Sequence, residues 1–381
     1  MINNTDIEFM RHAMALAQCG EGAVNPNPLV GALVVRDGRV VAQGYHARYG
    51  DLHAERNAFK DAEARGIDCK GATMYVTLEP CCHHGHQPPC TEAVIAHRIA
   101  RVVVGLLDPN PLVAGKGLDL LRHAGIEVDM VDPNSQLGKD LKKQNRVFLR
   151  YITQHRPWVV AKYAMTLDGK ICTHTGDSKW ISCSTSRERV HHLRKALTGI
   201  VCGIGTVLAD DPMLNTRIAD EPKARNPIRI VLDRQLRIPM ACQLVETASQ
   251  QRTIVVHAPQ ADEQKRVLLE EAGVTTWCCS SLTEMLDRAS SERIDSLLLE
   301  GGGTINEAFL REGLIDEVYA FIAPKLVGGA EAKTPIEGTG FASLSDAIKL
   351  NDIDVEIVGQ DILVHGFTQT STNHTDTCSQ E

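Results

Sequence analysis

The stretch TLEPCCHHGHQPPC, residues 77–90, holds three cysteines and three histidines. It follows a predicted strand at 72–78 (ATMYVTL) and precedes a predicted helix at 91–98 (TEAVIAHR). A tetrahedral metal site in a protein uses at most four such side chains. The stretch therefore predicts a metal site at a strand-to-helix junction, and it contains more possible ligands than the site can use.

The residues around this stretch alternate between strand and helix patterns. Asp37-Gly38 is a hairpin signal, and Thr5-Asp6-Ile7-Glu8 reads as a capping box that opens a helix. Such alternation indicates α/β architecture. Strands are predicted at 30–35, 39–44, 101–107 and 126–131, and helices at 5–18, 53–65 and 117–124.

A second α/β pattern begins at PWVVAKYAM, residues 157–165. Its predicted strands are 228–232, 253–257, 296–300, 317–323, 354–358 and 361–366, and its predicted helices are 184–197, 261–271 and 304–312. We therefore predict four segments: a first domain at 1–145, a linker at 146–156, a second domain at 157–367 and a polar, disordered tail at 368–381.

Composition excludes several classes of protein. The chain has 381 residues, 43% hydrophobic and 23% charged, with a net charge of −8. That charge disfavours a nucleic-acid partner, and no apolar run reaches the roughly 18 residues of a membrane helix. The N-terminus does not read as a signal peptide, so the twelve cysteines are expected as thiols or metal ligands in a cytoplasmic protein.

The metal ligands can be narrowed by spacing. His53-Ala54-Glu55 opens a predicted helix upstream of the cysteine stretch. One histidine and two cysteines, with a glutamate two residues after the histidine, is the arrangement of zinc deaminases. The second cysteine of a C-x-x-C would fall on a histidine here, which makes Cys90 the partner of Cys81. We predict His53, Cys81 and Cys90 as ligands of one Zn²⁺, with Glu55 as the proton shuttle.

A closed, structural zinc site is the alternative. It would add His83 or His84 as a fourth ligand and leave Glu55 without a role. Cys82 is adjacent to Cys81 and is expected outside the site, because neighbouring residues seldom reach one metal together.

The motifs of this half resemble those of a known family. NPNPLVGALVV (25–35), GYHARYGDLHAE (44–55) and TLEPCCHHGHQPPC (77–90) look like the deaminase half of the bifunctional riboflavin-biosynthesis deaminase–reductases. The resemblance implies a cytidine-deaminase-like, three-layer α/β/α domain acting on a diaminopyrimidinone ribonucleotide. It also implies substrate contacts at Asn27, His46 and His83, while His86 stands where relatives commonly have Arg or Lys.

The second half carries weaker motifs on its own. LLLEGGGTINEAFL (297–310) reads as a strand, a glycine loop and a helix, which suits either a phosphate-binding loop or a plain tight turn. It lacks the third glycine of the dinucleotide-binding fingerprint. Arg194 and Arg217 could clamp a phosphate, or could be ordinary solvated charges.

Together, KYAMTLDGK (162–170), GDSKWIS (176–182) and GTVLADDPMLNTR (205–217) resemble the reductase half of the same family. The resemblance implies a dihydrofolate-reductase-like fold that uses NADPH to reduce the ribosyl group to ribityl. It implies substrate contacts at Ser178, Arg194, Leu214, Arg217 and Glu300, catalytic roles for Lys162 and Glu300, and NADPH contacts at Ala164, Trp180, Thr206, Asp210, Gly302, Gly303, Thr304 and Asn306.

We therefore expect a two-domain enzyme that deaminates a pyrimidine ribonucleotide through a zinc-activated water and then reduces its sugar. The resemblance also implies a homo-oligomer, a dimer or a tetramer. The rivals are a nucleic-acid base deaminase, a zinc-stabilised binding protein without turnover, and a chain with one active half. The sequence assigns no role to Cys82, Cys278, Cys279 or Cys378.

Overall fold

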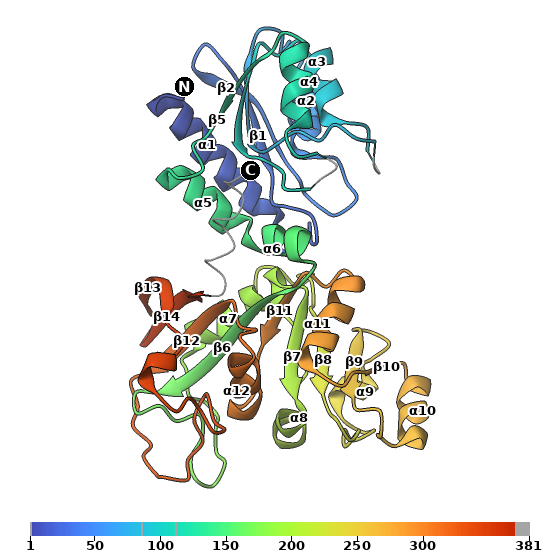
Figure 1. Ribbon diagram of the computed structural model, residues 1–381, viewed down its shortest axis with the longest axis vertical. Coiled ribbons are helices and arrows are strands. Elements are labelled where there is room, and N and C mark those ends of the chain that lie inside the picture. Colours follow the sequence, from blue (N-terminus) through green and yellow to red (C-terminus); the bar gives the residue numbers. More distant parts are fainter. Residues whose placement is uncertain (1, 85–86, 111–112, 370–381) are drawn as a thin grey trace. The chain divides into compact units, whose positions relative to one another are not determined.

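The chain divides into two compact units, Met1–His155 and Arg156–Glu381 (Figure 1). The structure, a computed structural model, describes residues 2–84, 87–110 and 113–369. His86, Cys378 and most of the predicted tail lie outside these ranges. None of the helices formed by the described residues combines the length and apolar character that crossing a membrane requires.

The first unit is built on a five-stranded sheet with the strand order β2-β1-β3-β4-β5. β1 is antiparallel to both β2 and β3, whereas β3, β4 and β5 run parallel. Asp37 and Gly38 turn the β1–β2 hairpin with positive φ angles of 52° and 70°, as the sequence signal predicts. The strands are β1 (Gly31–Arg36), β2 (Arg39–Tyr45), β3 (Thr73–Leu78), β4 (Arg101–Leu106) and β5 (Glu127–Met130).

Helices cover both faces of this sheet. Val34 and Met74 belong to a core cluster with residues of α2, α3 and α4, which Figure 1 places together beside the sheet. Leu33 and Tyr75, one position away, belong to a second cluster with α1 and α5, because successive strand residues point to opposite faces. The helices are α1 (Asn4–Ala17), α2 (Ala54–Ala64), α3 (Cys90–Ala96), α4 (Lys116–His123), α5 (Gln136–Gln144) and α6 (Arg146–Gln154), with the short η1 (Gln18–Gly20) after α1.

Residues 146–156, assigned above to a linker, instead contain α6, and the first compact unit extends to His155. Phe148 is buried in the core cluster beside α1, and Ile152 packs against it. The side chain of Asn145 pairs with the backbone of Leu29, accepting from its N–H at 2.8 Å and donating to its carbonyl at 3.0 Å. This basic, polar stretch has a helix-like pattern, and its apolar side chains pack on the first unit.

The start of α1 differs from the predicted capping box by two residues. Asn3, not Thr5, is the N-cap, and its side chain accepts from the N–H of Asp6 at 3.0 Å. Asp6 closes the box by accepting from the N–H of Asn3 at 2.8 Å. Asp6 therefore takes the place that the sequence pattern gave to Glu8.

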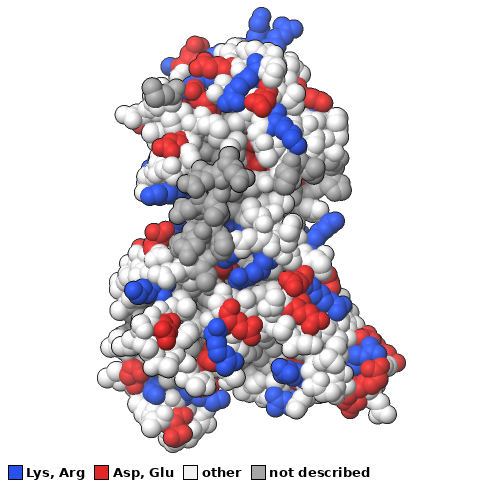
Figure 2. Space-filling model, viewed as in Figure 1, with Lys and Arg blue, Asp and Glu red and all other residues white. Residues whose placement is uncertain are grey.

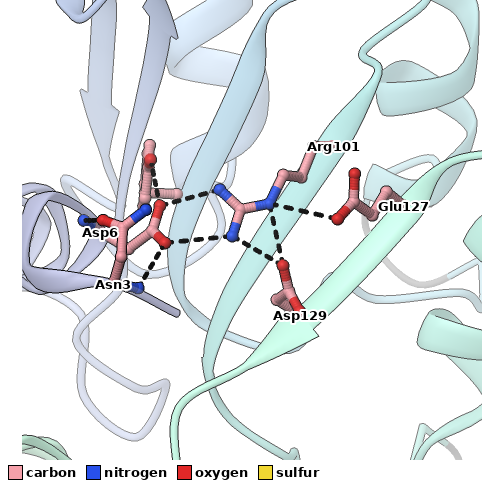
Figure 3. A network of polar contacts seen from close by, with 6 residues as sticks. Asn3, Asp6, Arg101, Glu127 and Asp129 are labelled. Atoms are coloured by element: carbon pink, nitrogen blue, oxygen red, sulfur yellow. Dashed lines mark hydrogen bonds and ion pairs between the residues drawn. The ribbon is translucent and has the colours of Figure 1, made fainter. Parts of the chain in front are cut away.

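Asp6 also anchors the helix to the sheet through Arg101 on β4 (Figure 3). The Arg101 guanidinium donates to both carboxylate oxygens of Asp6, at 2.8 and 3.1 Å, and to Asp129 on β5 at 2.6 Å. Tyr75 donates its hydroxyl proton to Asp6 at 2.7 Å. Burial opposes ionisation of Asp6, but Arg101 and the Asn3 N–H lower its pKa to about 2.

We expect Arg101→Met to destabilise the first unit by about 3 kcal/mol, because it leaves the 2% exposed Asp6 without its counter-charge. The contribution of Asp6 is present above its unfolded pKa of 3.8 and is lost as the pH falls through about 2. The difference in free energy of unfolding between wild type and variant should therefore decrease below about pH 4.

Two reporters separate the units in a urea titration of this variant. All three tryptophans lie in the second unit, at 158, 180 and 277, so their fluorescence reports the unfolding of that unit. Zn²⁺ loaded into the first unit is released when that unit unfolds, and a chromogenic chelator detects the released metal. The control Arg122→Met removes an exposed Arg122–Asp119 pair and should change stability by less than about 1 kcal/mol. Equal transitions for the two variants would contradict a stabilising role of Arg101.

The second unit is built on a nine-stranded sheet with the order β10-β9-β8-β7-β11-β6-β12-β14-β13. The strands from β10 to β12 in this order are parallel, and β14 and β13 add an antiparallel edge. The strands are β6 (Trp158–Thr166), β7 (Gly199–Gly203), β8 (Ile228–Leu232), β9 (Thr253–His257), β10 (Thr275–Cys278), β11 (Ser296–Leu299), β12 (Glu317–Ala323), β13 (Leu350–Val358) and β14 (Asp361–Thr368).

Helices also cover this sheet. Phe309 of α12 and Met285 of α11 pack on the central strands in one core cluster, and Val190 of α7 packs on β12 and β14 in another. β10 and α11 were not predicted, since TTWC and its polar surroundings give only a short strand pattern. The helices are α7 (Ser184–Ala196), α8 (Ile204–Asp210), α9 (Gln243–Glu246), α10 (Glu263–Glu271), α11 (Leu282–Ser291), α12 (Gly303–Arg311) and the short η2 (Leu344–Asp346).

Candidate active sites

The predicted metal ligands of the first unit meet where β3 ends and two helices begin. His53 is the N-cap of α2, Cys81 follows β3, and Cys90 is the first residue of α3. Their donor atoms all lie within 4.8 Å of one another. Among the described residues, no other group of three His, Cys, Asp or Glu side chains meets the same description.

The spacing of these donors fits zinc. The Nδ1 atom of His53 lies 3.5 Å from the sulfur of Cys81 and 3.4 Å from that of Cys90. Tetrahedral zinc, with Zn–S near 2.3 Å and Zn–N near 2.0 Å, separates such donors by about 3.5 Å. His83 and His84 are not part of the donor group, and His84 faces Glu92 at 3.4 Å. Three protein ligands leave a fourth position for water or substrate, as in catalytic zinc sites.

The local electrostatics favour a thiolate at Cys81. Hydrogen bonds from the Cys90 thiol, from His53 and from the Cys90 backbone N–H lower the pKa of Cys81 to about 4, although burial opposes this. Cys90 holds the remaining proton, since the neighbouring Cys81 thiolate raises its pKa well above the ordinary value. A dication between the two sulfurs would favour the thiolate form of both.

Glu55 lies on the first turn of α2, two residues after the ligand His53. It is 3% exposed, and burial raises the pKa of its carboxyl group above the ordinary value. Glu55 lines the same cavity as His53 and Cys81, and it is not part of the donor group. A buried carboxyl with a raised pKa beside a metal site is suited to take up and release a proton.

This cavity has a volume of ≈ 240 Å³ and includes all three predicted substrate contacts. His46 is buried, and burial lowers the pKa of its imidazole, which favours the neutral ring. Its Nδ1 faces the carbonyl of Leu52 at 3.1 Å and must donate there, so its Nε2 accepts from the Asn27 amide at 3.2 Å. The pair thereby fixes the amide of Asn27 at the cavity wall.

His83 also lines the cavity, and its Nδ1 is buried without a hydrogen-bond partner among the described residues. An unpaired buried nitrogen is costly, so this atom is suited to a ligand or a water. His86, which stands where relatives commonly have Arg or Lys, lies outside the described residues.

The sequence reasoning missed two cavity residues on the loop after β4, Asp108 and Asn110. Burial raises the pKa of Asp108 to about 6. The loop is held by the buried carboxylate of Glu79, which accepts from the N–H groups of Asp108, Gly115 and Gly117 at 3.3, 2.9 and 2.9 Å. The signal was available, because Asp-Pro-Asn directly follows a parallel strand adjacent to the cysteine-bearing one.

The second unit has a larger cavity of ≈ 1160 Å³ along the carboxyl ends of its strands. The α8 and α12 helices begin at this cavity after Gly203 and Gly302, and neither N-terminus has a side-chain cap. Such helix ends present unpaired N–H groups to phosphate, so the cavity fits a dinucleotide. It is lined by the predicted Lys162, Ala164, Ser178, Thr206, Asp210, Glu300, Gly302, Gly303 and Thr304.

Glu300 at the end of β11 is held by two cations. Arg194 donates to its two carboxylate oxygens at 2.7 and 3.0 Å, and the Lys162 ammonium lies 2.8 Å away. Burial would raise the pKa of Glu300, but these cations lower it well below the ordinary range. Arg194 therefore pairs with a carboxylate, whereas the sequence analysis had left open a phosphate clamp or a solvated charge.

The remaining predicted residues do not line the cavity in this structure. Leu214 is buried, Arg217 is exposed, and the 63% exposed Trp180 lies beneath the guanidinium of Arg187. Asn306 is buried and donates to the carbonyl of Pro335 at 2.8 Å. Cys279, which had no assigned role, does line the cavity.

Comparison with known proteins assigns each unit to a protein family. A family model described as the cytidine and deoxycytidylate deaminase zinc-binding region matches residues 3–106, and one described as the RibD C-terminal domain matches 157–364. The riboflavin biosynthesis protein RibD of Actinobacillus pleuropneumoniae is 46% identical over 366 residues, which cover 94% of each chain. RibD of Aquifex aeolicus is 40% identical, covering 96% of this chain and 99% of the relative.

Solved structures agree with these matches. Acinetobacter baumannii RibD superimposes with a TM-score of 0.85 at 35% identity, covering 96% of this chain and 99% of the other. A diaminohydroxyphosphoribosylaminopyrimidine deaminase/5-amino-6-(5-phosphoribosylamino)uracil reductase from Thermotoga maritima gives 0.85 at 37% identity, with the same coverage.

Fold and sites define a two-domain enzyme class, a zinc-binding deaminase unit followed by a reductase unit. Within that class, the chain belongs to the RibD family of riboflavin biosynthesis proteins. The predicted α/β fold class and the predicted family are thereby confirmed.

Proposed function

We propose that the chain catalyses two reactions of riboflavin biosynthesis. The first unit hydrolytically deaminates 2,5-diamino-6-ribosylamino-4(3H)-pyrimidinone 5′-phosphate, and the second reduces the ribosyl group of the product to ribityl with NADPH. The observation that carries the proposal is the donor set of His53, Cys81 and Cys90, with the buried carboxyl of Glu55 on the same cavity.

In the deaminase unit, His53, Cys81 and Cys90 would hold one Zn²⁺. When bound, zinc supplies Lewis acidity and lowers the pKa of a coordinated water towards about 7. Glu55 takes the proton of the attacking water and delivers it to the leaving amine, for which its buried position and raised pKa are suited.

Substrate recognition in this unit rests on groups whose hydrogen bonds point into the cavity. The Asn27 amide, fixed by the neutral ring of His46, binds the polar edge of the pyrimidine, and His83 offers its unpaired Nδ1. Asp108 and Asn110, on the loop after β4, add further polar groups to the cavity. A cavity of ≈ 240 Å³ suits a single ring better than a long polymer.

In the reductase unit, Lys162 polarises the opened sugar while Glu300 holds its ammonium in place. Arg194 contributes by fixing Glu300. NADPH supplies the hydride when bound, and the protein orients it against the sugar. The uncapped start of α12 after Gly302 is suited to its pyrophosphate.

Four further residues that the family resemblance implies as ligand contacts remain part of this proposal, although they do not line the larger cavity. Leu214 and Arg217 would bind substrate, and Trp180 and Asn306 would bind NADPH. Closure of surface segments around the ligand, which is common in enzymes, would bring in the exposed Arg217 and Trp180, whereas Leu214 and Asn306 are buried.

We also propose a homo-oligomer. β13 forms the edge of the nine-stranded sheet, and Ile353, Val355 and Ile357 on it are 59%, 60% and 70% exposed. An apolar strip on the outermost strand of a sheet is suited to pairing with a second copy. Sedimentation velocity would give the mass, and a monomer at micromolar concentration would contradict this assignment.

A cytoplasmic location is proposed as well, because the site needs two reduced cysteines and a reducing compartment keeps thiols available. A nucleic-acid base deaminase is the less favoured function. Basic and acidic side chains are interspersed over the face in Figure 2, and the net charge is −8. A nucleic-acid surface would group its Lys and Arg side chains into a basic track.

Removing the metal tests the proposed deaminase. We expect the chelator-treated chain to release ammonia from the pyrimidine nucleotide more than about 100-fold more slowly than the untreated chain. Added Zn²⁺ should restore the rate. Oxidation of NADPH with the deaminated nucleotide should remain, because that cavity lies in the other unit. Unchanged ammonia release from a verified zinc-free chain would contradict the proposal.

A further inference from the structure

The two cysteine ligands of the first unit are joined by a long link. Eight residues separate Cys81 from Cys90 in the sequence, whereas two separate the cysteines in the C-x-x-C signature of zinc deaminases. A longer link leaves the chain more conformational freedom, and fixing its end costs more entropy. Other contacts must therefore place Cys90 in the metal site.

One set of contacts holds the start of α3 against Cys81. The N–H and the hydroxyl of Thr91 both donate to the carbonyl of Cys81, at 3.2 and 3.3 Å. The N–H of Cys90 donates to the sulfur of Cys81 at 3.3 Å. These bonds join the two cysteines to each other, but they do not involve α2, at whose start His53 and Glu55 lie.

The side chain of Arg56 connects α2 to the end of the link. Arg56 follows Glu55 on α2 and is half-buried. Its Nε donates to the carbonyl of Pro88 at 3.0 Å, and its Nη2 donates to the carbonyl of Pro89 at 2.8 Å. Pro89 is the N-cap of α3 and directly precedes Cys90. One guanidinium thus joins the helix of the proton shuttle to the chain that carries a metal ligand.

The shape of the arginine side chain matters for this contact. Two donors of a rigid, planar fork bind the carbonyls of two consecutive residues, which a lysine ammonium cannot do in the same geometry. Elsewhere, α2 and α3 meet where the rings of Phe59 and His97 stack, with 3.9 Å between their centroids. His97 is the C-cap of α3, so Arg56 holds the metal end of a helix pair that is packed at its other end.

The positive charge of Arg56 acts in the opposite sense. A guanidinium three residues after the ligand His53 repels a bound dication and by itself would weaken zinc binding. Removing the side chain therefore speeds zinc release if the hydrogen bonds dominate, and slows it if the charge dominates. The sign of the change distinguishes the two effects.

We propose that Arg56 is a positioning residue of the deaminase unit, which holds the chain before Cys90 against α2 and thereby slows the release of zinc. The proposal rests on the zinc-dependent function proposed above. It concerns how firmly the metal is held, and it gives Arg56 no contact with the substrate.

Transfer of zinc from the loaded whole chain to an excess of a chromogenic chelator tests this without turnover. We expect Arg56→Met to release zinc at least about fivefold faster than wild type, because both hydrogen bonds are lost. Arg56→Lys, which keeps the charge but not the fork, should release zinc at an intermediate rate. The control Lys60→Met removes an exposed charge of the same helix and should release zinc as wild type does.

Hydrogen exchange of β3 and β4 in the metal-free chain separates placement of the ligand from general stability. Exchange there should be the same in Arg56→Met as in wild type, because the hydrogen bonds of Arg56 lie outside these strands. Exchange accelerated by the same factor as zinc release would make Arg56 a general stabilising residue and overturn the proposal. Unchanged or slower zinc release in Arg56→Met would also overturn it. A wild-type chain that takes up no zinc would instead reject the deaminase function, and this proposal with it.

Discussion

Glu55→Gln should lower the rate of ammonia release by about 10³-fold while leaving one zinc per chain. Glutamine keeps the size of the buried side chain but cannot move the proton from water to the leaving amine. Because Glu55 is outside the donor group of His53, Cys81 and Cys90, metal content should not change. Ammonia release and zinc content, measured on the same preparation, check both statements.

The control for this variant is Glu63→Gln. Glu63 lies on the same helix, α2, but it is exposed and pairs with His97 at 3.3 Å. Its loss should leave deamination within about twofold of wild type. Deamination by Glu55→Gln at the wild-type rate would reject Glu55 as the proton shuttle, and loss of zinc would make it a structural residue.

Lys162→Met should lower kcat for NADPH oxidation by about 10²-fold when the deaminated nucleotide is supplied. Methionine has a similar length but no charge, so it cannot polarise the sugar. Glu300 would keep its two hydrogen bonds from Arg194, at 2.7 and 3.0 Å, so the buried carboxylate would not lose all its partners. Steady-state absorbance of NADPH gives kcat, and calorimetric binding of NADP⁺ shows whether the cavity is intact.

The matched control is Lys223→Met, which removes an exposed lysine of the same unit outside the cavity lining. This variant should oxidise NADPH as fast as wild type does. If Lys162→Met changes only KM, the ammonium binds substrate without polarising the reacting sugar, and the catalytic assignment fails.

The deaminase donor set was predictable because its determinants are local. His53 and Glu55 are separated by one residue, and Cys90 opens the helix after Cys81. Each element is a short strand or helix with a clear apolar period, so the turns between them place the donors. The spacing of 3.4 and 3.5 Å between His53 and the two sulfurs follows from that arrangement.

The features that were missed depend on contacts between residues distant in the sequence. Asn145 pairs with Leu29, 116 residues away, and makes the predicted linker part of the first unit. Arg194 pairs with Glu300, 106 residues away, which no pattern around either residue indicates. A sequence motif gives the type of a side chain. The residue with which that side chain forms a hydrogen bond or ion pair is determined by the packing of the whole unit.

The measurement that tests the central claim most directly supplies the zinc-loaded chain with the diaminopyrimidinone nucleotide and NADPH together. Ammonia release and absorbance at about 340 nm, the reduced-nicotinamide signal, are followed in the same cuvette. We expect ammonia first, and NADPH oxidation after a lag that disappears when the deaminated nucleotide is given. Ammonia without NADPH oxidation, even with the deaminated nucleotide, would contradict the reductase assignment, and the absence of both signals would contradict the account as a whole.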